Sequence, residues 1–335
     1  MSETLPEARV EAIVSAFARA RVAVVGDMVT DAYVLGRPVR LSREAPVMIL
    51  RYEGEELVAG SAANAAHNLL ALGASVVPIG AVGDDARGAW LRGFFERAGC
   101  ASRGLVRDPA GTIVKTRVMA GESRRQKQQV IRLDQEPAGS WRPETEDAIV
   151  AEIERAAREV DAFLFSDYGY RTLSSRVRGR ALEATRGKIR VADSRYSLAE
   201  FAGVTLVTPN QEEAEACLGY SFDSEDAVRR AGFDLVTRLG TEAAFVTRGN
   251  LGLAVFDRKG RHESIPASGP SEIVDVTGAG DTVAAVATLC LVAGSTFGEA
   301  ARLSNHAASV VVMKLRAATL DTAELRAAAT RNPPD

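Results

Sequence analysis

Short apolar runs alternate with stretches of helical spacing along most of this chain. An apolar run of three to five residues between turn-forming residues predicts a buried strand, and apolar residues three or four positions apart predict a helix. The predicted strands cover residues 22–25, 76–79, 162–165, 189–192, 205–207 and 243–246. The predicted helices cover residues 62–72, 86–98, 144–159, 175–185 and 282–293. This alternation predicts an α/β fold with a doubly wound, mostly parallel sheet and helices on both faces.

Two segments, at about residues 33–52 and 112–133, break the alternation. Both carry β-forming residues with no good helical pattern between them, and in the second every other residue from 114 to 118 is apolar or β-branched. This pattern predicts a hairpin. We expect a small antiparallel β lid inserted in one domain of residues 1–330, because ligands collect where doubly wound sheets leave a crevice. A hairpin that only decorates the fold or joins two copies is the alternative.

The composition is that of an ordinary globular enzyme. The chain has 335 residues with 41 Lys and Arg, 44 Asp and Glu and a net charge of −3, which supplies no basic field for nucleic acid. The acidic N-terminal stretch predicts an amphipathic helix and not a signal peptide. The longest apolar stretch, 283–293, is shorter than the roughly 20 residues that cross a bilayer. We therefore predict a cytoplasmic protein without membrane or nucleic-acid partners, ending in a disordered tail at 331–335.

The cysteines and histidines are too widely spaced for a metal knuckle or a dense disulfide framework. We expect buried thiols and structural imidazoles. The residues are Cys100, Cys217, Cys290, His67, His262 and His306.

The segment DVTGAGDT, at residues 275–282, predicts an anion site. The small residues Gly278, Ala279 and Gly280 let a phosphate approach the backbone closely, and unpaired amides at a helix start point toward it. Asp281 stands beside this site, where a carboxylate is repelled by phosphate unless it has a task. It is either a general base that accepts the proton of an attacking alcohol or a helix cap.

Two other nucleotide-binding patterns are missing. The Gly187-Lys188 pair is followed by Ile189 and so completes no P-loop, and the first predicted strand is not followed by GxGxxG. Neither a P-loop enzyme nor an ordinary dinucleotide-binding dehydrogenase is supported.

Together with DVTGAGDT, five further motifs resemble those of the ribokinase-like (PfkB) carbohydrate kinases, in the same order and over nearly the whole chain. They are GDMVTD (26–31), AGSAAN (59–64), GAVGDDARG (80–88), TPNQEE (208–213) and VTRGNLG (246–252). The resemblance implies a ribokinase-like fold and the transfer of the γ-phosphoryl group of ATP to a sugar hydroxyl. A kinase of another sugar or nucleoside, or a non-catalytic sugar or nucleotide sensor on the same fold, is the alternative.

Within that family, four stretches are most similar to kinases of D-glycero-β-D-manno-heptose 7-phosphate. They are residues 40–50, 127–136, 165–169 and 304–320. The similarity implies phosphorylation of the 1-hydroxyl in the synthesis of ADP-heptose for the lipopolysaccharide core. Such kinases are often fused to a nucleotidyltransferase domain, and we expect this chain to be the stand-alone form.

The resemblance also assigns roles to individual residues. Asp281 corresponds to the base, and the amides of Gly278, Ala279, Gly280 and Asp281 correspond to the anion hole. Glu213 would order Mg²⁺ through water, although a helix cap explains the Asn210–Glu213 pair equally well. A monovalent cation is left open. The implied nucleotide-binding residues are Asn210, Glu213, Thr247, Gly249 and Asn305.

The sugar phosphate would be held by hydroxyl-binding and cationic residues. We rank Asp27 below Asp31 because it could instead brace the first strand's turn, and rank Arg124, Arg125 and Lys127 low because they fall in a turn. We also expect a homodimer. The predicted substrate-binding residues are Asp31, Gly60, Asn64, Lys115, Arg117, Arg132, Asp193 and Arg195.

Four features depart from the heptose-kinase pattern, all on the acceptor side. Ser61 replaces a second glycine, Tyr170-Arg171 replaces Lys-Gly, Ser194-Arg195 after Asp193 replaces Pro-Lys, and the turn at 120–127 is longer. These departures bear on the identity of the sugar and leave the ATP side untouched.

Overall fold

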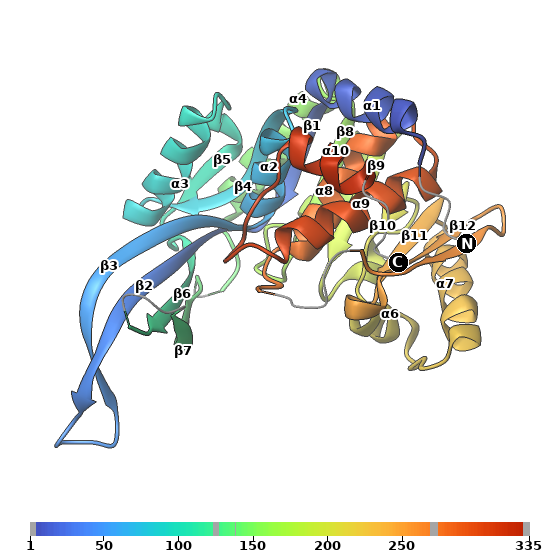
Figure 1. The fold of residues 1–335 in the computed structure, drawn as a ribbon. Coiled ribbons are helices and arrows are strands. Elements are labelled where there is room, and N and C mark those ends of the chain that lie inside the picture. Colours follow the sequence, from blue (N-terminus) through green and yellow to red (C-terminus); the bar gives the residue numbers. More distant parts are fainter. Residues whose placement is uncertain (1–4, 123–126, 138, 269–273, 331–335) are drawn as a thin grey trace.

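A nine-stranded sheet forms the centre of the computed structural model, which describes residues 5–122, 127–137, 139–268 and 274–330. The strand order is β13-β12-β11-β10-β9-β8-β1-β4-β5 (Figure 1). Strands β5 to β11 in this order are all parallel, and β12 and β13 add an antiparallel edge. The predicted mostly parallel sheet is confirmed. The predicted tail at 331–335 lies outside the described residues.

All six predicted strands are present in this sheet. Near-continuous apolar runs suit strands that are covered on both faces. The nine strands of the sheet, of which β5, β12 and β13 were not predicted, are β1 Arg21–Gly26, β4 Ser75–Gly83, β5 Leu105–Asp108, β8 Ala162–Asp167, β9 Ile189–Ser194, β10 Leu206–Val207, β11 Ala243–Thr247, β12 Leu253–Asp257 and β13 His262–Ile265.

Helices cover both faces of the sheet and build one apolar core on each side. The helices of the first core are α1 Glu7–Ala16, α2 Ala62–Ala71, α3 Ala86–Arg97, α8 Ala279–Val292, α9 Phe297–Val311 and α10 Thr322–Thr330. The helices of the second core are α4 Pro143–Glu159, α5 Ser175–Ala184, α6 Gln211–Leu218 and α7 Glu225–Leu239. The predicted helices are confirmed, except that α8 begins three residues before the expected Thr282.

A second sheet, in the order β3-β2-β6-β7, contains the segments that we expected to act as a lid, and we call it the lid. Its strands are β2 Met28–Leu41, β3 Met48–Ser61, β6 Ile113–Ala120 and β7 Gln128–Gln135. Each hairpin is antiparallel, as predicted, but the two hairpins join through a parallel pairing of β2 with β6. The lid sheet is therefore mixed. The expected segment at 33–52 also proves too short, since β2 follows β1 almost directly.

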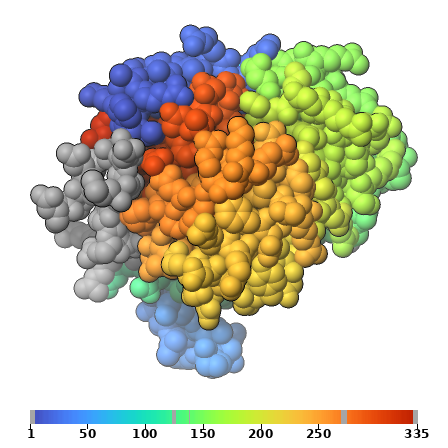
Figure 2. Space-filling model, turned by 90° about the vertical axis from the view of Figure 1, so that its right-hand side faces the viewer, coloured from blue at the N-terminus to red at the C-terminus, as the bar shows by residue number. Residues whose placement is uncertain are grey.

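The β2–β3 hairpin projects far from the body of the molecule (Figures 1 and 2). Its outer part exposes large apolar side chains, with Leu41 68% and Met48 52% exposed, and Leu133 on β7 is 61% exposed. No helix in the described part of the chain is long and apolar enough to span a membrane.

Candidate active site

Asp281 lies in the first turn of α8, where it is 3% exposed. Its Oδ2 accepts a hydrogen bond from Asn64 Nδ2 at 2.7 Å, and its Oδ1 accepts one from the Tyr168 hydroxyl at 2.9 Å. The residue that caps α8 is Gly278, and no side chain in the described residues caps this helix. Asp281 is therefore not a helix cap, and its carboxylate is held by side chains from two other segments.

Burial raises the pKa of Asp281 to about 6, although the hydrogen bonds from Asn64 and Tyr168 act to lower it. A general base works best when its pKa lies close to the working pH. Burial and the charge of Asp281 raise the pKa of Tyr168 well above its usual value. Tyr168 therefore stays protonated and acts as a donor.

Hydrogen bonds among buried amides determine whether the oxygen or the NH₂ group of the Asn64 side chain points to Asp281. Asn68 Nδ2 lies 3.0 Å from the backbone oxygen of Asn64 and 3.3 Å from Asn64 Oδ1. Because a backbone carbonyl can only accept, the Asn68 group beside it must be the NH₂, and its Oδ1 then faces the Thr282 hydroxyl at 3.0 Å. Asn64 Oδ1 accepts from Asn68, so the Asn64 NH₂ is left to donate to Asp281.

The turn before α8 requires glycine at position 278. Gly278 has φ 83°, and a Cβ there would lie 2.5 Å from Asn64 Nδ2. A side chain would thus strain the backbone and push Asn64 away from Asp281. The absence of a side chain at Gly278 therefore lets the start of α8 pack closely against α2.

Of the four amides predicted for the anion hole, one is used within the turn. The N–H of Ala279 donates to Val276 O at 3.2 Å. No backbone hydrogen bond within the described residues uses the N–H of Gly278, Gly280 or Asp281. These three amides could therefore bind a phosphoryl group.

Tyr168 is a site residue that we did not predict from the sequence. It follows β8 directly, at the carboxyl end where parallel strands deliver side chains to a shared crevice. The only available signal was this position within FSDYG. Asp27 supports the same loop, because its fully buried carboxylate accepts N–H bonds from Tyr168, Tyr170 and Thr172 at 2.8, 3.0 and 3.1 Å. We expected Asp27 to brace, if anything, the turn of the first strand, and these contacts show that it braces the loop after β8.

The lid presents a charged face toward this site. Asp31 and Arg117, on the neighbouring strands β2 and β6, form an ion pair of 2.9 Å. A Cβ on Gly60 would lie 2.8 Å from the Asp31 carboxyl carbon, so glycine leaves the room that this carboxylate occupies. Two of the predicted acceptor-side residues, Asp31 and Arg117, therefore pair with each other.

Lys115 is buried at the inner end of the same face. Its Nζ donates to Ser61 Oγ at 3.2 Å and lies 5.0 and 5.2 Å from the ring centres of Tyr168 and Tyr170. Burial lowers the pKa of Lys115, while the charge of Asp31 acts to raise it. Ser61 and Tyr170, two of the departures, thus meet at one buried cation.

The other candidate cations lie further out or are already paired. Arg132 binds Asp134 on its own strand at 2.6 Å, and Lys127 binds Glu53 at 2.7 Å and ties the two hairpins together. Arg195 is exposed beside Tyr196, and its charge acts on Glu213 and so on the opposite half of the site. Arg124 and Arg125 lie outside the described residues.

Asn210 and Glu213 form a capping box at the start of α6. Asn210 Oδ1 accepts from Glu213 N at 2.8 Å, and Glu213 Oε2 accepts from Asn210 N at 2.9 Å. This is the alternative expected for the pair, and it occupies only one oxygen of Glu213. Burial raises the pKa of Glu213.

Three carboxylates converge at the carboxyl end of the sheet. Burial raises the pKa of Asp193 well above its usual value, and the charges of Glu213 and Asp281 raise it further. A cation would relieve this repulsion. The described residues contain no group of three or more His, Cys, Asp or Glu that could hold a metal ion together. A magnesium ion beside Glu213 and Asp193 would need waters and phosphate oxygens as its further ligands.

The remaining nucleotide-side candidates lie along two strand ends and α9. Thr247 ends β11 and bridges to Asn210, and Gly249 has φ 56° in the turn that follows. Asn305 Nδ2 donates to Pro266 O at 2.8 Å and to Ser268 Oγ at 3.0 Å. Thr247 and Asn210 are thus together, whereas Asn305 holds the segment 266–268 after β13.

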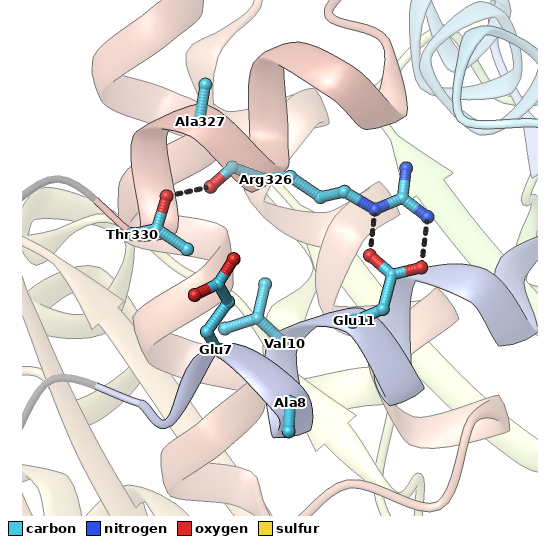
Figure 3. A pocket seen from close by; sticks show the side chains of 7 residues that line it. All are labelled: Glu7, Ala8, Val10, Glu11, Arg326, Ala327 and Thr330. Atoms are coloured by element: carbon cyan, nitrogen blue, oxygen red, sulfur yellow. Dashed lines mark hydrogen bonds and ion pairs between the residues drawn. The ribbon is translucent and has the colours of Figure 1, made fainter.

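A surface hollow of about 450 Å³ lies elsewhere, between α1 and α10 (Figure 3). Arg326 crosses it to bind Glu11 at 2.6 Å. None of the predicted site residues lines this hollow, and we assign it no chemistry. Its lining residues are Glu7, Ala8, Val10, Glu11, Arg326, Ala327 and Thr330.

Comparison with known proteins identifies related sequences. Residues 19–323 match the pfkB family carbohydrate kinases. The chain is 35% identical over 305 residues to the bifunctional protein HldE of Nitratiruptor sp., covering 91% of this chain and 64% of that protein. It is 36% identical over 330 residues to the HldE of Geotalea uraniireducens, covering 96% of this chain and 66% of that protein. The chain thus spans slightly less than two thirds of these relatives.

Solved structures share the fold at low sequence identity. Phosphofructokinase-2 from Escherichia coli, in complex with potassium, matches with a TM-score of 0.76 and 17% identity over 93% of this chain and 99% of that one. Ribokinase from Arabidopsis thaliana, complexed with ribose and ATP, matches with a TM-score of 0.70, 17% identity and the same coverage. The ribokinase-like fold is confirmed.

Proposed function

The chain belongs to the pfkB family of carbohydrate kinases, and from this premise we propose that its acceptor is a sugar phosphate, D-glycero-β-D-manno-heptose 7-phosphate, phosphorylated on its 1-hydroxyl. Such kinases transfer a phosphoryl group to an alcohol. The heptose assignment is supported by the HldE relatives at 35–36% identity. The product would enter ADP-heptose and lipopolysaccharide core synthesis in the cytoplasm.

One observation carries the mechanism: a buried carboxylate, Asp281, lies at the start of α8, where the amides of Gly278, Gly280 and Asp281 donate to no backbone group in the described residues. In the proposed reaction, an Asp281 oxygen takes the proton of the attacking hydroxyl as its oxygen bonds to the γ-phosphorus of ATP and the bond to the ADP oxygen breaks. The amides of Gly280 and Asp281 stabilise the charge on the phosphoryl oxygens. The proton stays on Asp281 until the product leaves.

The other residues would position the two substrates. Asn64 and Tyr168 hold the Asp281 carboxylate, and Asp31 and Gly60 would receive the sugar hydroxyls. Glu213 and Asp193 would hold hydrated Mg²⁺, which supplies charge neutralisation at the ATP phosphates. Thr247, Gly249 and Asn305 would contact the nucleotide, and Lys115, Arg117 and Arg132 would attract the acceptor phosphate. Closure of the lid would exclude water and so limit ATP hydrolysis.

A panel of acceptors tests this assignment. Purified protein with Mg-ATP is offered heptose 7-phosphate, unphosphorylated heptose, hexose 6-phosphates and nucleosides, and ADP release is followed. We expect kcat/KM for heptose 7-phosphate to exceed that of every other acceptor by at least ~100-fold. A higher value for another acceptor would transfer the assignment to that sugar, and would give a reason for Ser61, Tyr170 and Arg171.

The exposed apolar side chains of the lid support the proposal that the protein is a homodimer. Its outer edge strands, β3 and β7, carry exposed apolar side chains, including Met48 and Leu133, and Leu41 lies beside them at the end of β2. Pairing with a second copy would cover them. Sedimentation of the wild type and of a Leu41→Asp, Leu133→Asp variant tests this, because the variant should sediment as a monomer.

A further inference from the structure

Three residues other than glycine have a positive φ in the described part of the chain: Ser61 at 53°, Arg171 at 71° and Arg316 at 69°. Side chains rarely adopt this conformation, and such outliers persist where the surroundings hold them in place. Arg316 lies in the loop between α9 and α10, within the stretch 304–320 that resembles the heptose kinases, but we assigned it no role from the sequence.

The backbone of Arg316 is fixed to residues 275–278 before α8, which we call the catalytic turn. Its N–H donates to Asp275 Oδ2 at 2.9 Å, while Asp275 Oδ1 accepts from Thr277 N at 2.9 Å. The next residue, Ala317, packs on the turn, with its Cα 3.5 Å from where a Cβ on Gly278 would lie. Arg316 therefore lies in a loop that is held against the turn that positions Asp281.

The side chain of Arg316 reaches the lid. Its guanidinium carbon lies 4.9 Å from the centre of the Tyr33 ring, and that of Arg117 lies 5.3 Å from the same centre. Two guanidinium groups thus contact one aromatic ring at the border of the lid and the catalytic turn. Arg117 is paired with Asp31, and Arg316 is paired with Glu56 of β3.

The Tyr33 hydroxyl lacks a partner in the described part of the chain, although the residue is only 2% exposed. A buried hydroxyl without a hydrogen bond is costly, and a donor beside two guanidinium groups is suited to an anion with several acceptor oxygens. The Glu56 side chain is 47% exposed, so water screens its pair with Arg316. A dianion can therefore replace Glu56 as the partner of Arg316.

We propose that Arg316, with Arg117 and the Tyr33 hydroxyl, binds the phosphate monoester of the acceptor. The guanidinium plane offers parallel N–H groups that match two phosphate oxygens. Arg316 would add a phosphate contact from the body of the protein to those from the lid, which favours the closed lid when a phosphorylated sugar is bound. This inference rests on the proposed function.

Calorimetry in the absence of ATP tests this assignment with three proteins: the wild type, Arg316→Gly and Glu56→Gln. Each is titrated with heptose 7-phosphate and with unphosphorylated heptose. Arg316→Gly should bind heptose 7-phosphate at least ~10-fold more weakly, the usual effect of losing a charged hydrogen bond. Glu56→Gln should bind it more tightly, because the competing carboxylate is gone. Neither change should alter binding of the unphosphorylated sugar more than about twofold.

The two variants separate phosphate binding from a structural latch. If the Arg316–Glu56 pair only held the lid, both variants would weaken both ligands, and that result would overturn the assignment. Equal affinities in all three proteins would also overturn it while leaving the proposed function standing. A wild type that neither binds nor phosphorylates heptose 7-phosphate would contradict the proposed function, and the Arg316 assignment would fall with it. Glycine suits φ 69°, so Arg316→Gly should fold normally.

Discussion

The side chains of Asn64 and Asp281, 217 residues apart in the chain, are joined by a buried hydrogen bond of 2.7 Å. This contact connects the start of α2 with the start of α8. It brings together AGSAAN and DVTGAGDT, two motifs that the sequence could only place in order. Asn64, which we expected to bind the sugar, donates to the Asp281 carboxylate through the NH₂ of its amide, and its role toward a sugar remains a proposal.

Replacing Asp281 by Asn should lower kcat/KM at least ~100-fold, because the base is lost while the shape of the side chain is kept. Stability should not fall. The folded-state pKa of Asp281, about 6, lies above the ordinary 3.8, so the ionised form destabilises the fold above pH 6. Asp281→Asn should therefore raise the free energy of unfolding at pH 8 by about 1–3 kcal/mol. Steady-state kinetics and urea denaturation measure the two effects.

A buried carboxylate outside the site serves as the control for Asp281→Asn. Asp108 accepts a hydrogen bond from Thr145 Oγ1 at 2.6 Å. Burial acts to raise the pKa of Asp108, but hydrogen bonds led by that from Thr145 lower it overall. Asp108→Asn should lose stability at neutral pH and keep kcat. If both variants lost activity in proportion to stability, Asp281 would have no special role.

The wild-type pH profile should reflect the ionisation of Asp281. Since a general base must be unprotonated, kcat/KM should decrease as the pH falls through about 6 and stay level between about pH 7 and 8. A carboxylate with an ordinary pKa would retain activity down to about pH 4. Measuring kcat/KM from about pH 4.5 to about pH 8.5, in buffers of constant ionic strength, decides between these outcomes.

Asn68→Asp should shift that profile without a direct contact to substrate. The ionised carboxylate that this change introduces offers only acceptors to the Asn64 oxygens, so the Asn64 amide would rotate and no longer donate to Asp281. Losing a hydrogen bond to its ionised carboxylate raises the pKa of Asp281. The fall of kcat/KM at low pH should therefore move to a pH about one unit higher.

Thr288→Val controls for lost stability in that experiment. The Thr288 hydroxyl is buried on α8 and bonds only Ala284 O within the described residues, at 2.7 Å. Its removal should lower the free energy of unfolding and leave the pH at which kcat/KM falls unchanged. An unshifted pH dependence of kcat/KM in Asn68→Asp would show that the buried amides do not control Asp281.

Gly278→Ala should reduce both stability and activity. Its φ of 83° disfavours a side chain, and the new Cβ would displace Asn64. Gly219 has the same φ with open space around it, so Gly219→Ala measures the backbone cost alone, about 1 kcal/mol. We expect Gly278→Ala to lose more stability than this, and at least ~10-fold in kcat, whereas Gly219→Ala keeps its kcat. Equal effects would mean that Asn64 tolerates the methyl group.

The sequence predicted the strands and helices well because each is fixed by local periodicity. The apolar runs at 22–25 and 162–165 became β1 and β8 with only small changes at their ends. The lid was harder, because β2 and β6 pair in parallel although they are far apart in the chain, and no local pattern specifies such a partner. The start of α8 was missed by three residues because the glycines that disfavour a helix also form its first turn.

The site residues also fall into those that the sequence identified and those that only the structure identified. Asp281, Asn64 and Asp31 stood in motifs that assigned each of them a role. Tyr168 and Arg316 lay in matched stretches that assigned them none, and Asn68 lay in no motif, because the importance of all three comes from contacts with segments distant in sequence. A tyrosine after a strand, an amide on a helix and an arginine in a loop have ordinary surface or packing roles in most proteins, and only the folded chain distinguishes these three.

Identification of the product tests the central claim most directly. The wild type and Asp281→Asn are incubated with Mg-ATP and heptose 7-phosphate, and the new phosphate is located by ³¹P NMR. We expect one ADP for each heptose 1,7-bisphosphate from the wild type and at least ~100-fold less product from the variant. Release of ADP without a new sugar phosphate, or equal product from the two proteins, would contradict the account.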